Sequence, residues 1–198
     1  MRTCSDLNEA GSRFSSTHLD FAGFKFSKSA LDTAMRVFQN DQNRTTAVET
    51  LGAGITTLST HSDLLTFGES VCEWGRGQRV WANLLRHNGR GKLARQYSSW
   101  FDVVRDSNDS AEAIAPYKGI KGLGVSFASK HLRMLDPQKY AVLDDVLSQG
   151  LGFALNAKGY GLFMSLLLDF SVKNELSNNF ATIEGGIFVL VRQNVRAQ

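Results

Sequence analysis

Apolar residues recur at helical spacing along most of the chain. In the segment after Phe26, the residues Leu31, Met35 and Phe38 fall on one face of a helix that Ser27 or Ser29 can cap. The same period predicts helices over 45–58, 62–71, 80–86, 92–104, 111–117, 146–155 and 161–176. The apolar run 187–191, which follows a Gly-Gly pair, fits either a helix or a strand. The chain is therefore predicted to be mainly α.

Alternation with a period of two is scarce along the chain. It is confined to Phe21–Phe26, and the sequence contains neither an internal repeat nor a low-complexity segment. With 198 residues, the chain is long enough for one substantial core or for two small lobes that share a cleft. We expect a polar N-terminal tail over residues 1–20 and a single folded unit over residues 21–198.

Composition excludes several classes of protein. Hydrophobic residues make up 42% of the chain, yet the densest apolar run, Leu162–Leu168, is far shorter than the roughly 20 residues that span a bilayer. The polar start Met1–Thr17 lacks the apolar core of a secretory signal, so a cytoplasmic location is expected. Two cysteines, Cys4 and Cys72, are too few for a disulfide framework or for a cysteine-based metal or iron–sulfur site.

Positive charge is concentrated in two stretches that contain no carboxylate. The formal net charge is only +3, but residues 74–101 and residues 113–135 include no Asp or Glu. Such stretches suit contacts with phosphate groups, which dominate the affinity of proteins for nucleic acid, although solvated basic faces would give the same pattern. The basic residues are Arg76, Arg79, Arg86, Arg90, Lys92 and Arg95 in the first stretch and Lys118, Lys121, Lys130 and Arg133 in the second.

A glycine motif in the second stretch carries the functional prediction. Gly122 and Gly124 enclose a leucine, and the small residue Ala128 follows four positions later. Glycines here allow a tight reversal, and the free N–H groups at the start of the next helix can face a phosphate oxygen. We expect DNA contacts from both glycines and from the flanking residues Lys118, Lys121 and Ser126, with Ile120, Leu123 and Leu132 packed between the two helices.

Glycines at this spacing also occur in two different structural settings. A dinucleotide-binding loop needs a preceding strand, whereas residues 111–117 have the composition of an Ala-rich helix. An ordinary turn between two helices can also contain glycines, but it does not require the apolar and small residues that fit around them. The motif therefore favours a hairpin that binds the DNA backbone.

The full pattern resembles the helix-hairpin-helix (HhH-GPD) superfamily of base-excision DNA glycosylases, and within it the small prokaryotic proteins with an 8-oxoguanine DNA glycosylase-like fold. The likeness covers about Glu112–Gly152, in which Asp145 follows Gly124 by 21 residues. It implies a two-lobed helical fold with the DNA and base cleft between the lobes. It also implies a helix-hairpin-helix over 111–135 and a catalytic loop over 136–146.

The resemblance implies that Asp145 enters the active site, with Asp144 as the close alternative. A fixed carboxylate stabilises the positive charge that develops on the deoxyribose as the N-glycosidic bond breaks, and it can orient or deprotonate the attacking water. Capping of the helix that follows would explain this pair of acids without catalysis.

A lysine that is missing from its usual place narrows the expected reaction. Bifunctional members of the superfamily carry a lysine two residues after the second hairpin glycine, where this chain has Ser126. A hydroxyl cannot replace the amine that forms a Schiff base, so a monofunctional enzyme that leaves an abasic site is expected. Lys130 lies one helical turn further on the same face and is a candidate displaced nucleophile, but a phosphate or solvent contact is the favoured role for it.

Aromatic residues are candidates for the base pocket or for the wedge that fills the duplex. A glycosylase holds the flipped base between flat side chains. The segment Trp74–Arg79 is favoured because its glycines interrupt the helix and because Arg76 and Arg79 can meet the DNA. The other candidates, each of which can instead be a core residue, are Trp81, Trp100 and Phe153.

The sequence thus predicts a monomeric, nucleoid-associated DNA glycosylase that needs no cofactor or metal and acts on double-stranded DNA with a modified base. Oxidised guanine, alkylated purines, deaminated bases and the hypermodified bases of phage DNA remain open as substrates, the last implying antiviral defence. A non-catalytic DNA-binding module is one alternative. A structure-specific nuclease subunit is another, although it would need several metal-binding carboxylates.

Overall fold

The computed structural model describes residues 18–40 and 43–195, so Cys4 and most of the expected tail lie outside the described residues. Within these ranges the chain is mainly α, as predicted. None of the described helices is both long and apolar enough to cross a membrane. The helices are α1 (Lys28–Asn40), α2 (Asn43–Ala53), α3 (His61–Trp74), α4 (Gln78–Asn88), α5 (Arg90–Asp106), α6 (Ser110–Ile114), the 3₁₀ helix η2 (Ala115–Gly119), α7 (Val125–Leu135), α8 (Asp145–Leu151), α9 (Ala157–Lys173) and α10 (Phe180–Val195).

The alternating segment near the start forms a β-hairpin. Strands β1 (His18–Phe21) and β2 (Phe24–Ser27) pair antiparallel, with Leu19 opposite Phe26. The ring of Phe21 meets the ring of Phe163 on α9 edge to face, at 6.0 Å between centroids. Leu19 is buried, so residues 18–20, which were expected in the polar tail, belong to the described fold.

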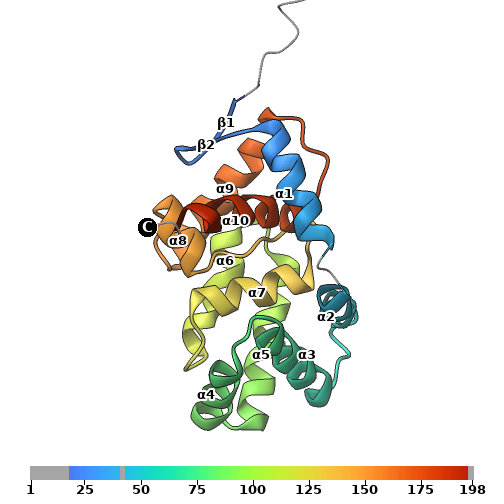
Figure 1. Cartoon of the computed structure of the whole chain (residues 1–198). Helices are drawn as coiled ribbons and strands as arrows, with labels where there is room; N and C mark the ends of the chain where they lie inside the picture. Colours follow the sequence, from blue (N-terminus) through green and yellow to red (C-terminus); the bar gives the residue numbers. More distant parts are fainter. Residues whose placement is uncertain (1–17, 41–42, 196–198) are drawn as a thin grey trace, which may run out of the picture.

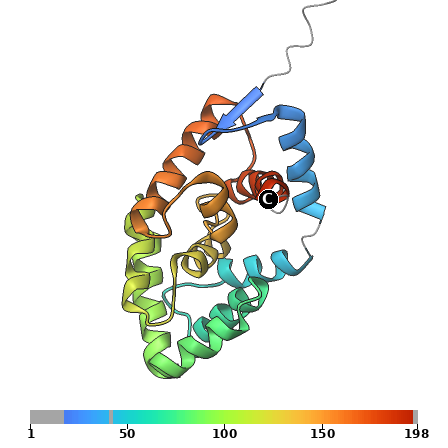
Figure 2. The ribbon, with the colours of Figure 1, turned by 60° about the vertical axis from the view of Figure 1, so that its left-hand side comes forward.

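Helix α7 lies at the centre of the molecule. In Figure 1 it runs between a lower group of helices, α3 to α5, and an upper group, α1 and α8 to α10, and Figure 2 shows the same arrangement from another side. It packs against α2 and α3 on the one hand and against α6 and α9 on the other. Ile120, Leu123, Ala128 and Leu132 are buried, as the hairpin motif predicted. The helix that follows the hairpin therefore contacts both groups.

His131 anchors the middle of α7. Its Nδ1 donates to the carbonyl oxygen of Phe127 at 2.7 Å, so Nε2 is left to accept from the hydroxyl of Tyr97 on α5 at 3.2 Å. Burial lowers the pKa of His131 to about 4, which keeps the ring neutral. The neutral ring thus links α7 to α5 without an unpaired buried charge.

Several helix boundaries differ from those predicted, and three of them have an identifiable local or packing cause. Helix α2 ends at Ala53, five residues before the predicted end, and the Thr-rich segment that follows is irregular. Helix α8 stops at Leu151 because Gly152 adopts φ +76, a left-handed conformation that ends a helix. Helix α10 is longer than predicted, since it continues through Gly185 and Gly186.

The two glycines of α10 serve close packing rather than chain reversal. A Cβ atom on Gly185 would lie 2.4 Å from the ring of Phe38, and one on Gly186 would lie 2.6 Å from Met35 Cγ. Both neighbours belong to α1, which packs along α10. The glycines therefore let α1 approach α10 closely, and this contact brings Phe38 to the cavity described below.

Candidate active site

The hairpin has the geometry expected of an anion-binding turn. Gly122 adopts φ +95, and Gly124 precedes α7 without any side chain capping that helix. The N–H groups of Val125 and Ser126, which precede the first N–H bonded to Gly124, are therefore open to an external acceptor. Lys118 and Lys121 are exposed beside the turn, as expected. Ser126 is not available in the same way, because its hydroxyl contacts Lys130.

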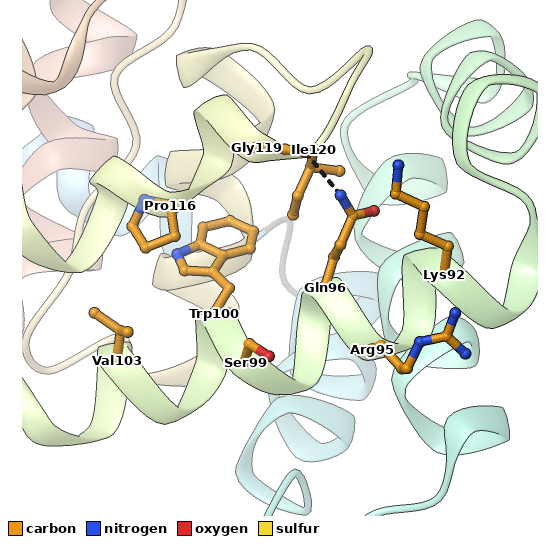
Figure 3. Close-up of a pocket in the computed structure, with 9 residues that line it drawn as sticks. All are labelled: Lys92, Arg95, Gln96, Ser99, Trp100, Val103, Pro116, Gly119 and Ile120. Atoms are coloured by element: carbon orange, nitrogen blue, oxygen red, sulfur yellow. Dashed lines mark hydrogen bonds between the residues drawn. The ribbon is translucent and has the colours of Figure 1, made fainter.

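Helices α4 and α5 hold the hairpin from one side. Asn88 donates to the carbonyl oxygen of Lys121 at 2.9 Å, and Gln96 donates to that of Gly119 at 2.7 Å. Figure 3 shows a hollow of about 390 Å³ at this junction, with Lys92 and Gln96 extending from α5 towards the hairpin. Its lining includes exposed basic side chains and no carboxylate, so it suits an anion rather than acid–base chemistry.

A smaller cavity, of about 190 Å³, lies where the two groups of helices meet α7. It brings together residues that are far apart in the sequence. Trp74, Arg76, Lys130 and Asp144 were all candidates from the sequence, and the cavity collects these four. The full lining is Phe38 from α1, Trp74, Gly75 and Arg76 from the end of α3 and the turn after it, Lys130 from α7, Val142 and Asp144 before α8, and Glu184 and Phe188 from α10.

Lys130 is buried in this cavity, with an exposed fraction of 8%. Its Nζ donates to the hydroxyl of Ser126 at 3.0 Å and to the carbonyl oxygen of the same residue at 3.3 Å. Burial lowers the pKa of Lys130, and the nearby carboxylate of Asp144 is the largest effect that opposes this shift. The expectation that Lys130 contacts solvent or phosphate is therefore wrong: a buried amine with increased neutral character lines the cavity.

The turn after α3 covers Lys130. A Cβ atom on Gly75 would lie 2.9 Å from Lys130 Cδ, and one on Gly77 would lie 2.2 Å from the ring of Phe127. Between them, Arg76 adopts φ +56 and is exposed at the cavity. The glycines that interrupt the helix in this segment thus allow the backbone to lie directly on the side chains of α7.

The two neighbouring acids occupy different positions. Asp144 lines the cavity and caps α8, since its Oδ1 accepts from the N–H groups of Val146 and Leu147 at 3.0 and 3.1 Å. Asp145 is exposed in the first turn of α8 and is not part of the lining. Spacing in the sequence favoured Asp145 as the site residue, whereas the geometry favours Asp144. The Asp144 side chain both caps α8 and lines the cavity.

Glu184 is a cavity residue that the sequence reasoning missed. Its exposed fraction is 4%, and its Oε2 accepts from the N–H of Val142 at 3.4 Å. Burial raises the pKa of Glu184 to about 8, against the opposing effect of the Arg133 cation. A signal was present in the sequence, because Glu184 is the single charged residue in the otherwise apolar stretch 180–191. A lone acid in such a stretch is expected to be buried and functional or paired.

The aromatic candidates divide into one cavity residue and three core residues. Trp74 is half-buried and lines the cavity, where its indole donates to the hydroxyl of Thr45 at 2.9 Å. Trp81, Trp100 and Phe153 are buried in the core and do not line this cavity, although an edge of Trp100 lines the hollow at the hairpin. The helical spacing of these three residues therefore indicated core packing. The other aromatic residues that line the cavity are Phe38 on α1 and Phe188 on α10.

Of the basic side chains outside the cavity, Arg133 is buried and paired with Glu49 at 2.8 Å, so it is not available to phosphate, whereas the others are exposed next to the hairpin. Arg79 lies in the first turn of α4, and the rest follow on α4 and α5, which the hydrogen bonds described above tie to the hairpin. The exposed residues are Arg79, Arg86, Arg90, Lys92 and Arg95. One basic surface thus extends from the hairpin over the turn between α4 and α5.

Comparisons with known proteins add no relative. No family model matches the chain, and no curated protein or solved structure matches it either. Among the described residues, no group of three or more His, Cys, Asp or Glu side chains is arranged to hold a metal ion.

Proposed function

We propose that this protein is a DNA glycosylase that takes a damaged or modified base into the cavity beside α7 and breaks its N-glycosidic bond. One observation carries the proposal. The helix that starts at the hairpin also carries Lys130, a buried amine, into the same cavity as the Asp144 carboxylate. Helix α7 thus links a phosphate bound at the hairpin to a nucleophile, Lys130, which lies beside a proton acceptor, Asp144.

The surroundings of the cavity support a DNA ligand. The hairpin and the adjoining surface of α4 and α5 carry exposed basic side chains suited to phosphate contacts. The half-buried rings of Phe38, Trp74 and Phe188 give the cavity flat apolar walls, between which a flipped base can be held. The location of the cavity between two groups of helices fits a two-lobed glycosylase fold with the base cleft between the lobes.

The position of Lys130 favours base release by its amine over the water-based, monofunctional route expected from Ser126. The neutral Nζ attacks C1′ of the deoxyribose as the bond from C1′ to the base breaks. Asp144 accepts a proton from the attacking amine and passes it to the departing base. The bond between C1′ and O4′ then breaks as Nζ and C1′ form a protonated Schiff base, and O4′ takes a proton from water. Loss of a C2′ proton to solvent expels the 3′ phosphate, and water hydrolyses the Schiff base to free Lys130.

A panel of duplexes tests the proposed function. Each duplex carries one altered base, chosen from oxidised guanine, alkylated purines, deaminated bases and modified cytosines. We expect release of a free base from at least one duplex and none from the unmodified control, measured by chromatography. If no duplex loses a base, while the protein still binds DNA, the chain is the non-catalytic binding module instead.

The hairpin lysines provide a separate prediction on binding. The double change Lys118→Gln and Lys121→Gln is expected to weaken binding to every duplex alike and to reduce the slope of log affinity against log salt by about 1 for each phosphate that the protein no longer binds. Fluorescence anisotropy at several salt concentrations measures this slope. Lys173→Gln, an exposed lysine at the end of α9, serves as the control. An unchanged slope in the double variant would show that the hairpin does not contact DNA.

A further inference from the structure

Glu184 has no part in the chemistry assigned to Lys130 and Asp144, although it shares their cavity. It is the most deeply buried of the ionisable side chains that line this space. A buried carboxyl costs free energy unless its hydrogen bonds are satisfied. Oε2 accepts from the backbone N–H of Val142, and the carboxyl lines the cavity, where a ligand can hydrogen-bond it.

The cavity separates two tasks. Lys130 and Asp144 supply the amine and the carboxylate that act at the sugar, whereas Phe38, Trp74 and Phe188 supply its flat apolar walls. An apolar cavity obtains specificity from a small number of convergent polar groups. Asp144 already uses Oδ1 to cap α8, and Arg76 is exposed, so Glu184 is the buried polar group left to read the ligand.

We propose that Glu184 is a specificity residue whose carboxyl hydrogen-bonds the edge of the flipped base and selects an uncharged base that presents an acceptor atom beside an N–H donor. This inference rests on the proposed function and assigns a substrate class to the same site. Such edges occur on the neutral nucleobases, among them cytosine, adenine and, through O6 and N7–H, 8-oxoguanine. The cationic N-alkylpurines of DNA fall outside the class because of their charge.

The protonation of Glu184 gives the chemical reason for this choice. Its pKa of about 8 makes it mainly a neutral acid at neutral pH, with Oε1–H as a donor and the free lone pair of Oε2 as an acceptor. Burial is the main cause of this state. Asp144 before α8 adds to it, whereas Arg133 and Lys130 on α7 oppose it, and Arg76 in the turn after α3 is the other charged residue that lines the cavity. The element α1 contributes only an aromatic side chain at the cavity. The Oε1–H donor and the Oε2 acceptor of Glu184 therefore match a base edge that presents an acceptor beside an N–H donor.

The size of the cavity limits the ligand to a base. Its volume of about 190 Å³ is below the roughly 300 Å³ at which pockets for drug-sized ligands begin. A single heterocycle is therefore the expected occupant, while a sugar attached to a hypermodified base would have to lie outside the cavity. This favours small alterations of the base over bulky ones.

Replacement of Glu184 tests the inference on any duplex whose base wild type releases. Glu184→Gln keeps one donor and one acceptor, so its rate at pH 7 is expected to stay within about threefold of wild type. Glu184→Leu removes both groups and is expected to lower the rate by about tenfold or more. Above about pH 8 wild type loses the donor, so its rate relative to that of Glu184→Gln is expected to fall. Glu69→Gln, an exposed glutamate on α3, is the control.

Binding of free bases separates this inference from the proposed function. Calorimetry with cytosine, adenine, 8-oxoguanine and 9-methylpurine requires no catalysis, and thermal melting shows whether each variant is folded. We expect the first three to bind wild type and Glu184→Gln more tightly than Glu184→Leu, and 9-methylpurine, which has no N–H donor, to bind weakly to all. Equal binding to folded wild type and Glu184→Leu would overturn the inference. Binding that depends on Glu184 in a protein that releases no base would overturn the proposed function alone.

Loss of activity in Glu184→Gln that equals the loss in Glu184→Leu would also overturn the substrate class. It would mean that an ionised carboxylate, with two acceptor oxygens, reads the base, since Gln cannot reproduce that pattern. The preferred base would then present two N–H donors or carry a positive charge.

Discussion

Lys130→Gln is expected to abolish covalent trapping of the protein on its DNA substrate by borohydride and to lower base release by more than about 1,000-fold. Borohydride reduces a Schiff base to a stable amine, so a trapped complex reports the bond between Nζ and C1′. Gln has nearly the length of Lys but no nucleophilic amine. Gel electrophoresis of labelled duplex measures trapping and strand cleavage, and chromatography measures release of the base.

Two further variants make the Lys130 result specific. Lys173→Gln removes an exposed lysine at the end of α9 and is expected to leave trapping unchanged. Ser126→Lys in the Lys130→Gln background returns an amine to the same face one turn earlier, since Ser126 Oγ lies 3.0 Å from Lys130 Nζ in the natural chain. Recovery of trapping in that double variant is the expected result. Full base release by folded Lys130→Gln without trapping would instead establish the water-based, monofunctional reaction.

Asp144→Asn is expected to lower base release by about 100- to 10,000-fold, the range typical of a lost general acid or base. Asn remains a good N-cap, so α8 and the folded state should be retained. The loss should therefore appear in the rate of a single turnover rather than in thermal stability or in DNA affinity. Single-turnover kinetics with enzyme in excess, together with thermal melting, measure the two effects separately.

Asp145→Asn is the matched control, because this neighbouring acid is exposed in the first turn of the same helix and does not line the cavity. Its rate is expected to stay within a few-fold of wild type. The reverse result, with Asp145→Asn inactive and Asp144→Asn active, would restore the assignment made from spacing and would refute the one made from geometry.

The helices could be predicted because their apolar spacing is local. Leu31 and Met35 fall on one face of α1 in the sequence and are buried in the structure. At the start of α10, where the predicted boundary was wrong, the deciding contact was distant in sequence. Gly185 was expected to precede the last element, yet it lies inside α10, because its missing side chain makes room for the ring of Phe38 on α1. A sequence alone does not distinguish a glycine that allows close packing of helices from a glycine that allows a turn.

The candidate site could be predicted only in part. Helical spacing predicted that Ser126 and Lys130 lie on the same face of the helix. In the structure Lys130 donates a hydrogen bond to the Ser126 hydroxyl, as that spacing allows. Burial of that face depends on the turn at Gly75 and Gly77, which reaches α7 from more than 40 residues away in the chain. The prediction of an exposed lysine failed because helical periodicity does not report what covers a face.

By itself, the sequence determined the mainly α class, the hairpin with its open helix start, the basic surface beside it and the pair of acids that follows. Each of these depends on residues close together in the chain. Only the tertiary structure decided that Asp144 rather than Asp145 enters the cavity, that Lys130 is buried there, and that Glu184 joins them from the last helix. The physical reason is that burial and the pKa shifts that follow from it arise where separate helices pack together, and no local pattern of residues specifies that contact.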